Sequence, residues 1–228
     1  MALYAYKKKR ISKSSIVINK ISRISIILGL ILMFWAFYPV ISFEIYSKFF
    51  IKQSKQKISK DSKQVDLTKA SFWFPDLEVK QATQNINVKE YSLSLPKLNI
   101  ENAMVKVGAD DLTKSLIQFV PTSLPGENGN VVILGHSTLP QLYDIKDYKT
   151  IFTYLPSLKE GDKIEVKLGD QVFEYEVFDM IVVKPSEVSV LKQDFSNSYL
   201  TLITCVPPGT YWNRLIVKAK IVDTLELF

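Results

Sequence analysis

Cysteine and histidine each occur only once in this chain of 228 residues, as Cys205 and His136. One cysteine cannot form a disulfide within the chain, so its thiol must be buried and inert, bonded to another molecule, or reactive. Glycine is also scarce, at eight residues, and we find no repeat of fixed period and no glycine-rich phosphate-binding loop. The two single residues are therefore the first candidates for chemistry.

Acidic side chains are absent from residues 1–23, which hold seven Lys and Arg, and residues 24–43 hold no charge of either sign. The other 185 residues carry 22 basic and 23 acidic side chains. The net charge of +6 thus belongs to the N-terminal tail. It gives no reason to expect a nucleic-acid-binding surface on the rest of the chain.

The uncharged run ISIILGLILMFWAFYPVISF, residues 24–43, has the roughly 20 residues that cross a bilayer. Trp35 and Tyr38 lie toward its far end, where aromatic residues favour the membrane interface. A cleaved signal peptide is disfavoured by the length and the lack of a small-residue cleavage site, and a buried core helix by the flanking cations. We predict a basic cytoplasmic tail (1–23), a transmembrane anchor (24–43) and an extracellular remainder (44–228).

Residues 44–90 are predicted to form an extracellular stalk or linker. Its lysine-rich part, residues 48–64, has no regular apolar face past Phe50, which is typical of a solvated or frayed segment. Contact with anionic surface polymers is the alternative. The aromatic stretch SFWFP follows at 71–75, and the sequence leaves open whether it packs on the domain edge or partly covers a groove.

A β-rich domain is predicted for residues 91–228, where short runs of β-forming residues alternate with turn residues. The spacing favours an antiparallel sandwich or a barrel. Short helices are expected near 110–119 and 151–157. The predicted strands are 92–100, 131–134, 163–168, 172–183, 199–205 and 214–222.

The run YLTLITC places Cys205 at the end of a strand. Its alternation puts the two leucines and Thr204 on one face and Cys205 on the other. We expect the core to take the leucine face, so that the sulfur points away from it. Two prolines then force a turn, and if the next strand pairs back, Arg214 lies opposite Cys205 on the solvent-facing side of the hairpin. His136 follows the run VVILG, also at a strand end, where function tends to collect.

These three side-chain types can act together in acyl transfer. A thiol has a pKa of about 8.5, and an imidazole can accept its proton or stabilise the thiolate. A guanidinium can bind the charge that develops on an attacked carbonyl oxygen. A buried inert cysteine and a tolerated lone histidine are the alternatives.

The motif TLITC at 201–205, followed by an arginine nine positions after the cysteine, resembles the TLxTC signature of the sortases, the cysteine transpeptidases of Gram-positive surfaces. The resemblance covers about residues 91–222. It extends through LPKLNI (95–100), PGENGNVVILGHS (125–137), LKEGDKIEV (158–166) and VVKPSEVSVL (182–191).

The resemblance implies an all-β fold, a closed eight-stranded β-barrel with short helices and with the site in a groove on its outer wall. It implies Cys205 as the nucleophile, His136 as the general acid and base, and Arg214 as the residue that binds substrate and oxyanion. Thr204 corresponds to a position that contacts the substrate.

The implied reaction is cleavage of an LPxTG-like sorting signal of a surface protein, between Thr and Gly, through a thioacyl enzyme. The protein then passes to an amine of a cell-wall precursor or to a pilin lysine. Alternatives are a pilin-polymerising sortase, a hydrolase, and a decayed membrane-tethered β-barrel binding module. The chain has no Asp-Pro-aromatic lid motif and no second, C-terminal span, which favours wall anchoring over pilus polymerisation.

No cofactor or metal is predicted. Some sortases bind calcium near the groove. The candidate calcium ligands in this chain are Asp110, Asp111 and Glu187. Charged loop residues are usually only solvated, so these three carry no prediction of a site.

Overall fold

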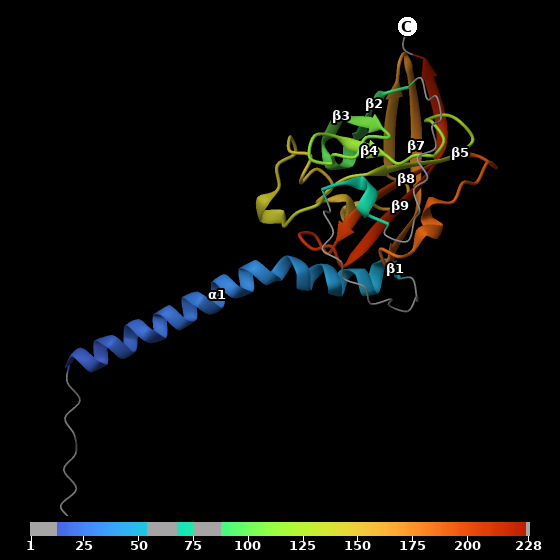
Figure 1. The fold of residues 1–228 in the computed structure, drawn as a ribbon. Coiled ribbons are helices and arrows are strands. Elements are labelled where there is room, and N and C mark those ends of the chain that lie inside the picture. Colours follow the sequence, from blue (N-terminus) through green and yellow to red (C-terminus); the bar gives the residue numbers. More distant parts are fainter. Residues whose placement is uncertain (1–12, 54–67, 75–87, 227–228) are drawn as a thin grey trace, which may run out of the picture.

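The computed structural model describes residues 13–53, 68–74 and 88–226. It consists of one long helix, α1 (Lys13–Phe50), that leads into a barrel of strands (Figure 1). Most of the predicted basic tail and of the lysine-rich stalk segment lies outside the described residues, as do residues 75–87.

The elements that follow α1 in the described residues are short 3₁₀ helices and strands. The 3₁₀ helices are η1 (Ala70–Phe72), η2 (Pro96–Leu98), η3 (Pro140–Leu142), η4 (Leu155–Ser157) and η5 (Val188–Leu191). The strands are β1 (Lys52–Gln53), β2 (Glu90–Leu95), β3 (Ile100–Val107), β4 (Leu116–Gln118), β5 (Gly129–Leu134), β6 (Lys163–Leu168), β7 (Gln171–Val183), β8 (Ser198–Val206) and β9 (Asn213–Glu226).

The sheet closes on itself. Its strand order is β1-β7-β6-β2-β3-β4-β5-β8-β9, and β9 also pairs with β7. This last pairing runs from Gln171 opposite Glu226 to Val183 opposite Arg214, and it joins the two sides of the sheet. Eight strands therefore form a closed barrel, to which β1 adds along β7. The predicted all-β fold, an eight-stranded closed barrel with few helices after one N-terminal apolar helix, is confirmed.

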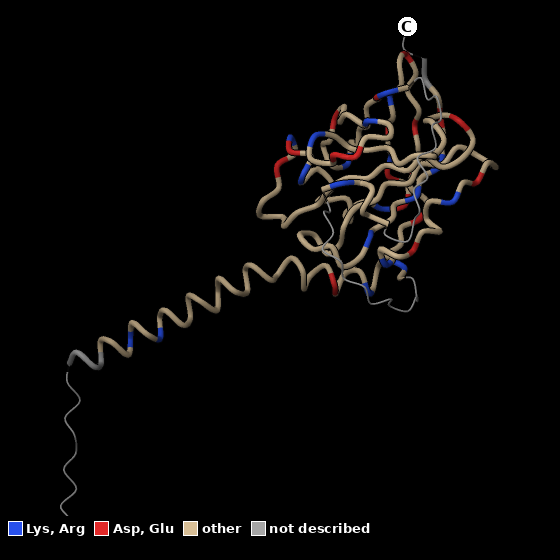
Figure 2. The backbone as a smooth tube through the Cα atoms, viewed as in Figure 1, with Lys and Arg blue, Asp and Glu red and all other residues tan. Residues whose placement is uncertain are grey.

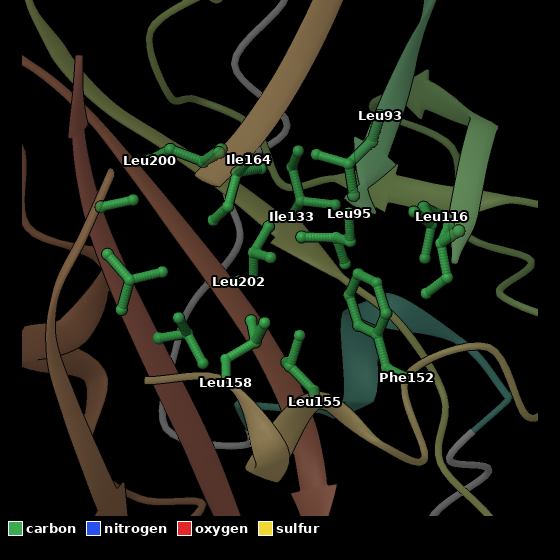
Figure 3. Close-up of a cluster of buried hydrophobic side chains, with 14 of the residues drawn as sticks. Leu93, Leu95, Leu116, Ile133, Phe152, Leu155, Leu158, Ile164, Leu200 and Leu202 are labelled. Atoms are coloured by element: carbon green, nitrogen blue, oxygen red, sulfur yellow. The ribbon is translucent and has the colours of Figure 1, made fainter. Parts of the chain in front are cut away.

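The interior of the barrel takes the side chains that alternation predicts. Leu200 and Leu202 of β8, Leu93 of β2 and Ile133 of β5 are fully buried. Figure 3 shows them around one centre, with Phe152 from the connection after β5. Burial of each such side chain contributes roughly 1.5–3 kcal/mol, so this cluster holds together the strands that carry the site.

A second buried cluster lies on the other face of β5, β8 and β9. Ile203 and Ile216 belong to it, together with Cys205. Trp73 and Phe74, which precede the barrel in the chain, complete it and are almost fully buried. The outer wall of the barrel is therefore covered and excluded from solvent at these residues.

Three predicted segments differ from the structure. The run 92–100 is interrupted by η2, since Pro96 has no N–H for a ladder and Asn99 adopts a left-handed φ of 55°. Strand β3 was therefore not predicted beyond residue 100. At 110–119, where a short helix was expected, β4 fills the gap between β3 and β5 with three buried side chains. The helix expected at 151–157 is a set of turns that ends in η4.

The C-terminal part of α1 packs on the barrel. Phe43 and Ile51 are buried in the interior cluster, and β1 pairs in parallel with Ile181 and Val182 of β7. The ammonium of exposed Lys52 lies 2.7 Å from a carboxylate oxygen of Asp179. Residues 44–53, the start of the predicted stalk, thus lie against the barrel.

The same helix fits a membrane anchor. Within the described residues, Val17–Phe50 is the one stretch of helix long and apolar enough to cross a membrane, and it includes the predicted span. Figure 2 shows no charged residue along its middle part.

Candidate active site

The β8–β9 hairpin brings two of the predicted site residues together. Cys205 is the register partner of Arg214, next to the Val206–Asn213 pair that leads into the loop. The register follows from the apolar alternation of both strands, which keeps Leu202 and Val217 on the interior face. The pairing predicted from the sequence is confirmed.

The predicted exposure of this face is wrong. Cys205 is 5% exposed and Arg214 is 1% exposed. The alternation was correct, because both residues point away from the interior cluster. However, Trp73 and Phe74 cover the outer face. The sequence of the hairpin alone cannot predict this cover, because the covering segment lies about 130 residues upstream.

His136 lies at the end of the neighbouring strand. β5 and β8 run in parallel with Leu134 opposite Ile203, and the amide of Gly135 donates to the carbonyl of Ile203 at 3.1 Å. His136 and Cys205 each lie two residues beyond this pair, at the same end of the barrel. The carbonyl of His136 accepts a 2.9 Å hydrogen bond from the amide of Phe152, which fixes its backbone.

Gly135 is required at this strand end by close packing. A Cβ atom there would lie 2.4 Å from the ring of Phe152 and 2.6 Å from the side chain of Leu116. Such distances are well inside van der Waals contact, so only glycine lets the chain pass into His136 at this position.

Thr204 and Ser137 hold the two strand ends together. Thr204 is fully buried, and its hydroxyl donates to the carbonyl of Gly135 at 2.8 Å. Ser137 donates from its hydroxyl to the carbonyl of Cys205 at 2.6 Å. The structure places the Thr204 side chain on the face opposite Cys205, so in this state it contacts the backbone before His136.

Trp73 covers the site directly. Its ring centroid lies 5.0 Å from the guanidinium carbon of Arg214 and 5.7 Å from the ring centroid of His136. Its carbonyl accepts a long hydrogen bond of 3.4 Å from Arg214 Nη2. The aromatic stretch therefore packs on the outer face of the barrel, over Arg214 and His136.

The covering segment, residues 68–74, is attached to the loop before β4. The amide of Ala70 donates to the carbonyl of Asp110, and the amide of Ser71 donates to the carboxylate of Asp110, both at 2.9 Å. The amide of Leu112 donates to the carbonyl of Thr68 at 3.0 Å. Three main-chain donors thus hold a segment that has little regular structure of its own.

Burial controls the electrostatics of the pair. It raises the pKa of the Cys205 thiol, and the nearby Arg214 guanidinium offsets part of that rise. Burial also lowers the pKa of Arg214, which Cys205 partly offsets. Under the cover, therefore, the site favours the neutral thiol beside a cation.

Arg214 has weak partners for a buried cation. Besides Trp73, it donates to the carbonyls of Tyr211 and Asn213 at 3.2 and 3.4 Å. Within the described residues no carboxylate pairs with it, and its Nε–H has no hydrogen-bond partner. Buried donors are rarely left unpaired, so this N–H is available for an acceptor that enters the site.

Residues 93–222 match the family model of the sortase domain. The chain belongs to the sortase family. Sortases are transpeptidases, and the place of Cys205, His136 and Arg214 on adjacent strand ends of the barrel is consistent with a site for acyl transfer.

Named relatives from several sortase types are similar to the chain. Sortase D of Bacillus subtilis is 29% identical over 132 residues, which cover 56% of this chain and 61% of that protein. Among solved structures, the Sortase D5 transpeptidase of Clostridium perfringens is 28% identical, with a TM-score of 0.51, over 59% of this chain and 79% of that one. Sortase C-1 of Actinomyces oris is 32% identical, with a TM-score of 0.52, over 58% and 73%.

The three acids considered for calcium have other partners in this sortase. Asp110 binds the covering segment, and the Thr113 hydroxyl, with Lys114, lowers the pKa of Asp111 to about 2. The carboxylate of Glu187 accepts from Ser189. In the described part of the chain, no three His, Cys, Asp or Glu side chains gather as a metal-binding group.

Trp73 and Ser137 contact the candidate site residues but were not predicted from the sequence to do so. Trp73 was noticed as part of an aromatic stretch, but its contact with Arg214 depends on the tertiary fold. Ser137 lies in the GHS triplet directly after His136 and was given no role. A small hydroxyl residue beside a candidate base at a strand end was the signal that could have identified it.

Proposed function

We propose that this sortase is a membrane-anchored cysteine transpeptidase. In the proposal it cleaves an LPxTG-like sorting signal of a surface protein between Thr and Gly and transfers the protein to an amine of the cell wall. The N-terminus lies in the cytoplasm, and the barrel lies outside the cell. The observation that carries the proposal is the pairing of Cys205 with Arg214 beside the strand end that bears His136.

The first half of the reaction makes a thioester. His136 takes the proton of the Cys205 thiol, the thiolate attacks the threonine carbonyl carbon, and the electron pair of the C=O bond moves to oxygen. Arg214 holds this oxyanion, for which its unpaired Nε–H is available. His136 donates a proton to the glycine nitrogen as the C–N bond breaks, which releases the glycine end as an amine.

The second half returns the enzyme to its starting state. An acceptor amine attacks the thioester carbonyl, and His136 takes the proton that the amine loses. The tetrahedral intermediate expels the Cys205 thiolate, and a new amide bond remains. Thr204, through the carbonyl of Gly135, keeps the strand end before His136 in place in this proposal.

Substrate entry requires the covering segment to move. Trp73 lies over the space beside Arg214 that a substrate carbonyl would occupy. Displacement of Trp73 would open the site at both residues, since Cys205 belongs to the same buried cluster as Trp73 and Arg214 lies against the Trp73 ring. The main-chain hydrogen bonds of residues 68–74 described above go to the loop at 110–112, so their loss in the opening would leave the strand pairings of the barrel in place.

A peptide assay tests the proposal. The purified full chain is incubated with an LPxTG peptide, with and without triglycine, and the products are identified by mass spectrometry. We expect cleavage after Thr, an adduct on Cys205, and a ligated product only with triglycine. Cys205→Ala should fold and give none of these. A Cys205→Ala enzyme as active as the parent would refute the assignment, and equal hydrolysis with and without amine would indicate a hydrolase.

The cover favours one alternative as a second candidate. Pilus-building sortases carry a lid with an Asp-Pro-aromatic motif, and Trp73 provides a cover without that motif. A pilin-derived lysine peptide offered in competition with triglycine distinguishes the two. Transfer to the lysine in preference to triglycine would assign the chain to pilin polymerisation.

A further inference from the structure

A groove of about 660 Å³ lies between α1 and the barrel. The α1 wall includes Tyr38, Phe43 and Tyr46, which share one face of the helix. Pro140 and Tyr154 belong to the opposite wall, which the barrel connections provide. Aromatic and proline side chains make most of this surface, so an apolar occupant fits it best.

The groove continues the surface of the membrane-spanning part of α1. Side chains from Val17 to Trp35 are exposed all around the helix, as expected for contact with lipid. Trp35 is 60% and Tyr38 is 56% exposed, and such aromatic side chains mark the interface. The groove begins at Tyr38, so its near end lies at the depth of the outer head groups.

The position of the groove selects between two apolar occupants. A helical protein segment is about 10 Å across and rigid. A single hydrocarbon chain is narrower and flexible, and it is the apolar group that the bilayer supplies at this position.

The charge at the groove also suits a lipid. Exposed Lys159 lines it and can pair with a phosphate. Ser42 and Ser157 also line it, and their hydroxyls donate to the carbonyls of Pro39 and Tyr154. Among the described lining residues there is no acid. We propose that this groove binds one hydrocarbon chain of a membrane phospholipid from the outer leaflet, with its phosphate near Lys159.

The groove adjoins the candidate active site. Pro140 lies four residues after His136, and Pro208 lies three residues after Cys205, and both line it. The two loops touch, because a Cβ atom at Gly209 would lie 2.6 Å from Leu139. A bound chain therefore contacts the loops of both residues. This consequence for the reaction rests on the proposed function, whereas the binding itself does not.

Photo-crosslinking in a bilayer tests the proposal. The full chain is placed in phosphatidylcholine–phosphatidylglycerol nanodiscs that contain a phospholipid with a diazirine in the middle of one chain. After irradiation, the adducts are mapped by mass spectrometry. We expect adducts on the barrel side of the groove, in the peptides that contain residues 140–141 and 153–159, in addition to those on the span.

Two filling variants and one control make the result specific. Ser42→Trp fills the groove from α1 and should lower barrel-side adducts at least about fivefold, and Ser157→Trp should do the same from the barrel. Ile45→Trp places the same side chain on the exposed side of the helix, where Ile45 is 57% exposed, and should leave them unchanged. The melting temperature of each variant confirms folding.

Two results would overturn the proposal. One is a pattern of adducts confined to residues 17–37. The other is an equal barrel-side yield in folded Ser42→Trp, Ser157→Trp and Ile45→Trp. The peptide assay is run on the same samples. Barrel-side crosslinking without any peptide cleavage would refute the proposed function and leave lipid binding in the groove supported. Peptide cleavage without barrel-side crosslinking would refute lipid binding and leave the proposed function supported.

Discussion

Arg214 is the residue whose surroundings are hardest to explain by stability alone. It is a buried cation that donates to three backbone carbonyls at 3.2 to 3.4 Å and leaves Nε–H unpaired. Such a group costs stability, because its desolvation is only partly offset. A site that binds a substrate carbonyl oxygen needs hydrogen-bond donors that are held in place and still lack a partner.

Arg214→Lys should keep the melting temperature and lose at least about tenfold in kcat/KM, roughly 1.4 kcal/mol of transition-state stabilisation. An ammonium cannot offer the planar set of donors of a guanidinium. Lys220→Arg, an exposed position on the same face of β9, is the matched control and should behave as the parent. Equal kcat/KM for Arg214→Lys and the parent would show that the oxyanion is held by other donors.

The pH dependence of Cys205 labelling follows from its burial. Burial raises the thiol pKa in the covered state, and only the thiolate reacts quickly. The labelling rate with iodoacetamide should therefore be low at pH 7 and rise with pH, with its inflection above the ordinary value of about 8.5. An inflection below 8 would mean that stabilisation by the cation exceeds the desolvation.

At the scale of elements, segment 68–74 changes the site most. The alternation of β8 and β9 directs one face of these strands outward, and segment 68–74 buries that face in a hydrophobic cluster. It has only one 3₁₀ turn and a bridge between Lys69 and Asp111. Its position is set by contacts with loop and barrel and not by its own structure.

Trp73→Ala should accelerate Cys205 labelling at least tenfold at constant pH and lower the pKa of its inflection, because water then reaches the thiol. Phe72→Ala alters the same segment at a residue that is 43% exposed, and should leave both values unchanged. The rates are measured on folded protein, which is verified by circular dichroism. If the two variants label alike, residues 68–74 do not control access.

The sequence predicted local features better than contacts between distant segments. Alternation in β8 and β9 was enough to pair Cys205 with Arg214, since both strands are long and regular. It could not predict β4, a strand of three residues whose place depends on β3 and β5. The cover by Trp73 was also beyond reach, because the contact joins parts of the chain 141 residues apart. The roles of the site residues stay predictions.

On the scale of the whole molecule, charge is divided along the chain. Seven cations precede the apolar span, whereas the rest of the chain is nearly neutral. Figure 2 shows blue and red residues mixed over the barrel. This asymmetry is the pattern that retains a basic tail in the cytoplasm.

Lysine labelling gives a direct measure of orientation. With an impermeant amine reagent on intact cells, we expect labels on barrel lysines such as Lys97 and none on Lys7, Lys8 and Lys9. Permeabilised cells should label both groups. Labelling of the tail alone in intact cells would reverse the orientation.

The direct passage from α1 into β1 has a consequence for how partners are met. Because Phe43 and Ile51 are buried in the barrel core and β1 joins the sheet at once, a barrel anchored as we propose would have a fixed height over the bilayer. A partner in the same membrane therefore meets the site by lateral diffusion in two dimensions, at a constant level. A soluble protein with an identical signal must instead diffuse in three dimensions and reach the height of the site in each encounter. In this proposal, the anchor favours substrates whose cleavage point lies close to the membrane.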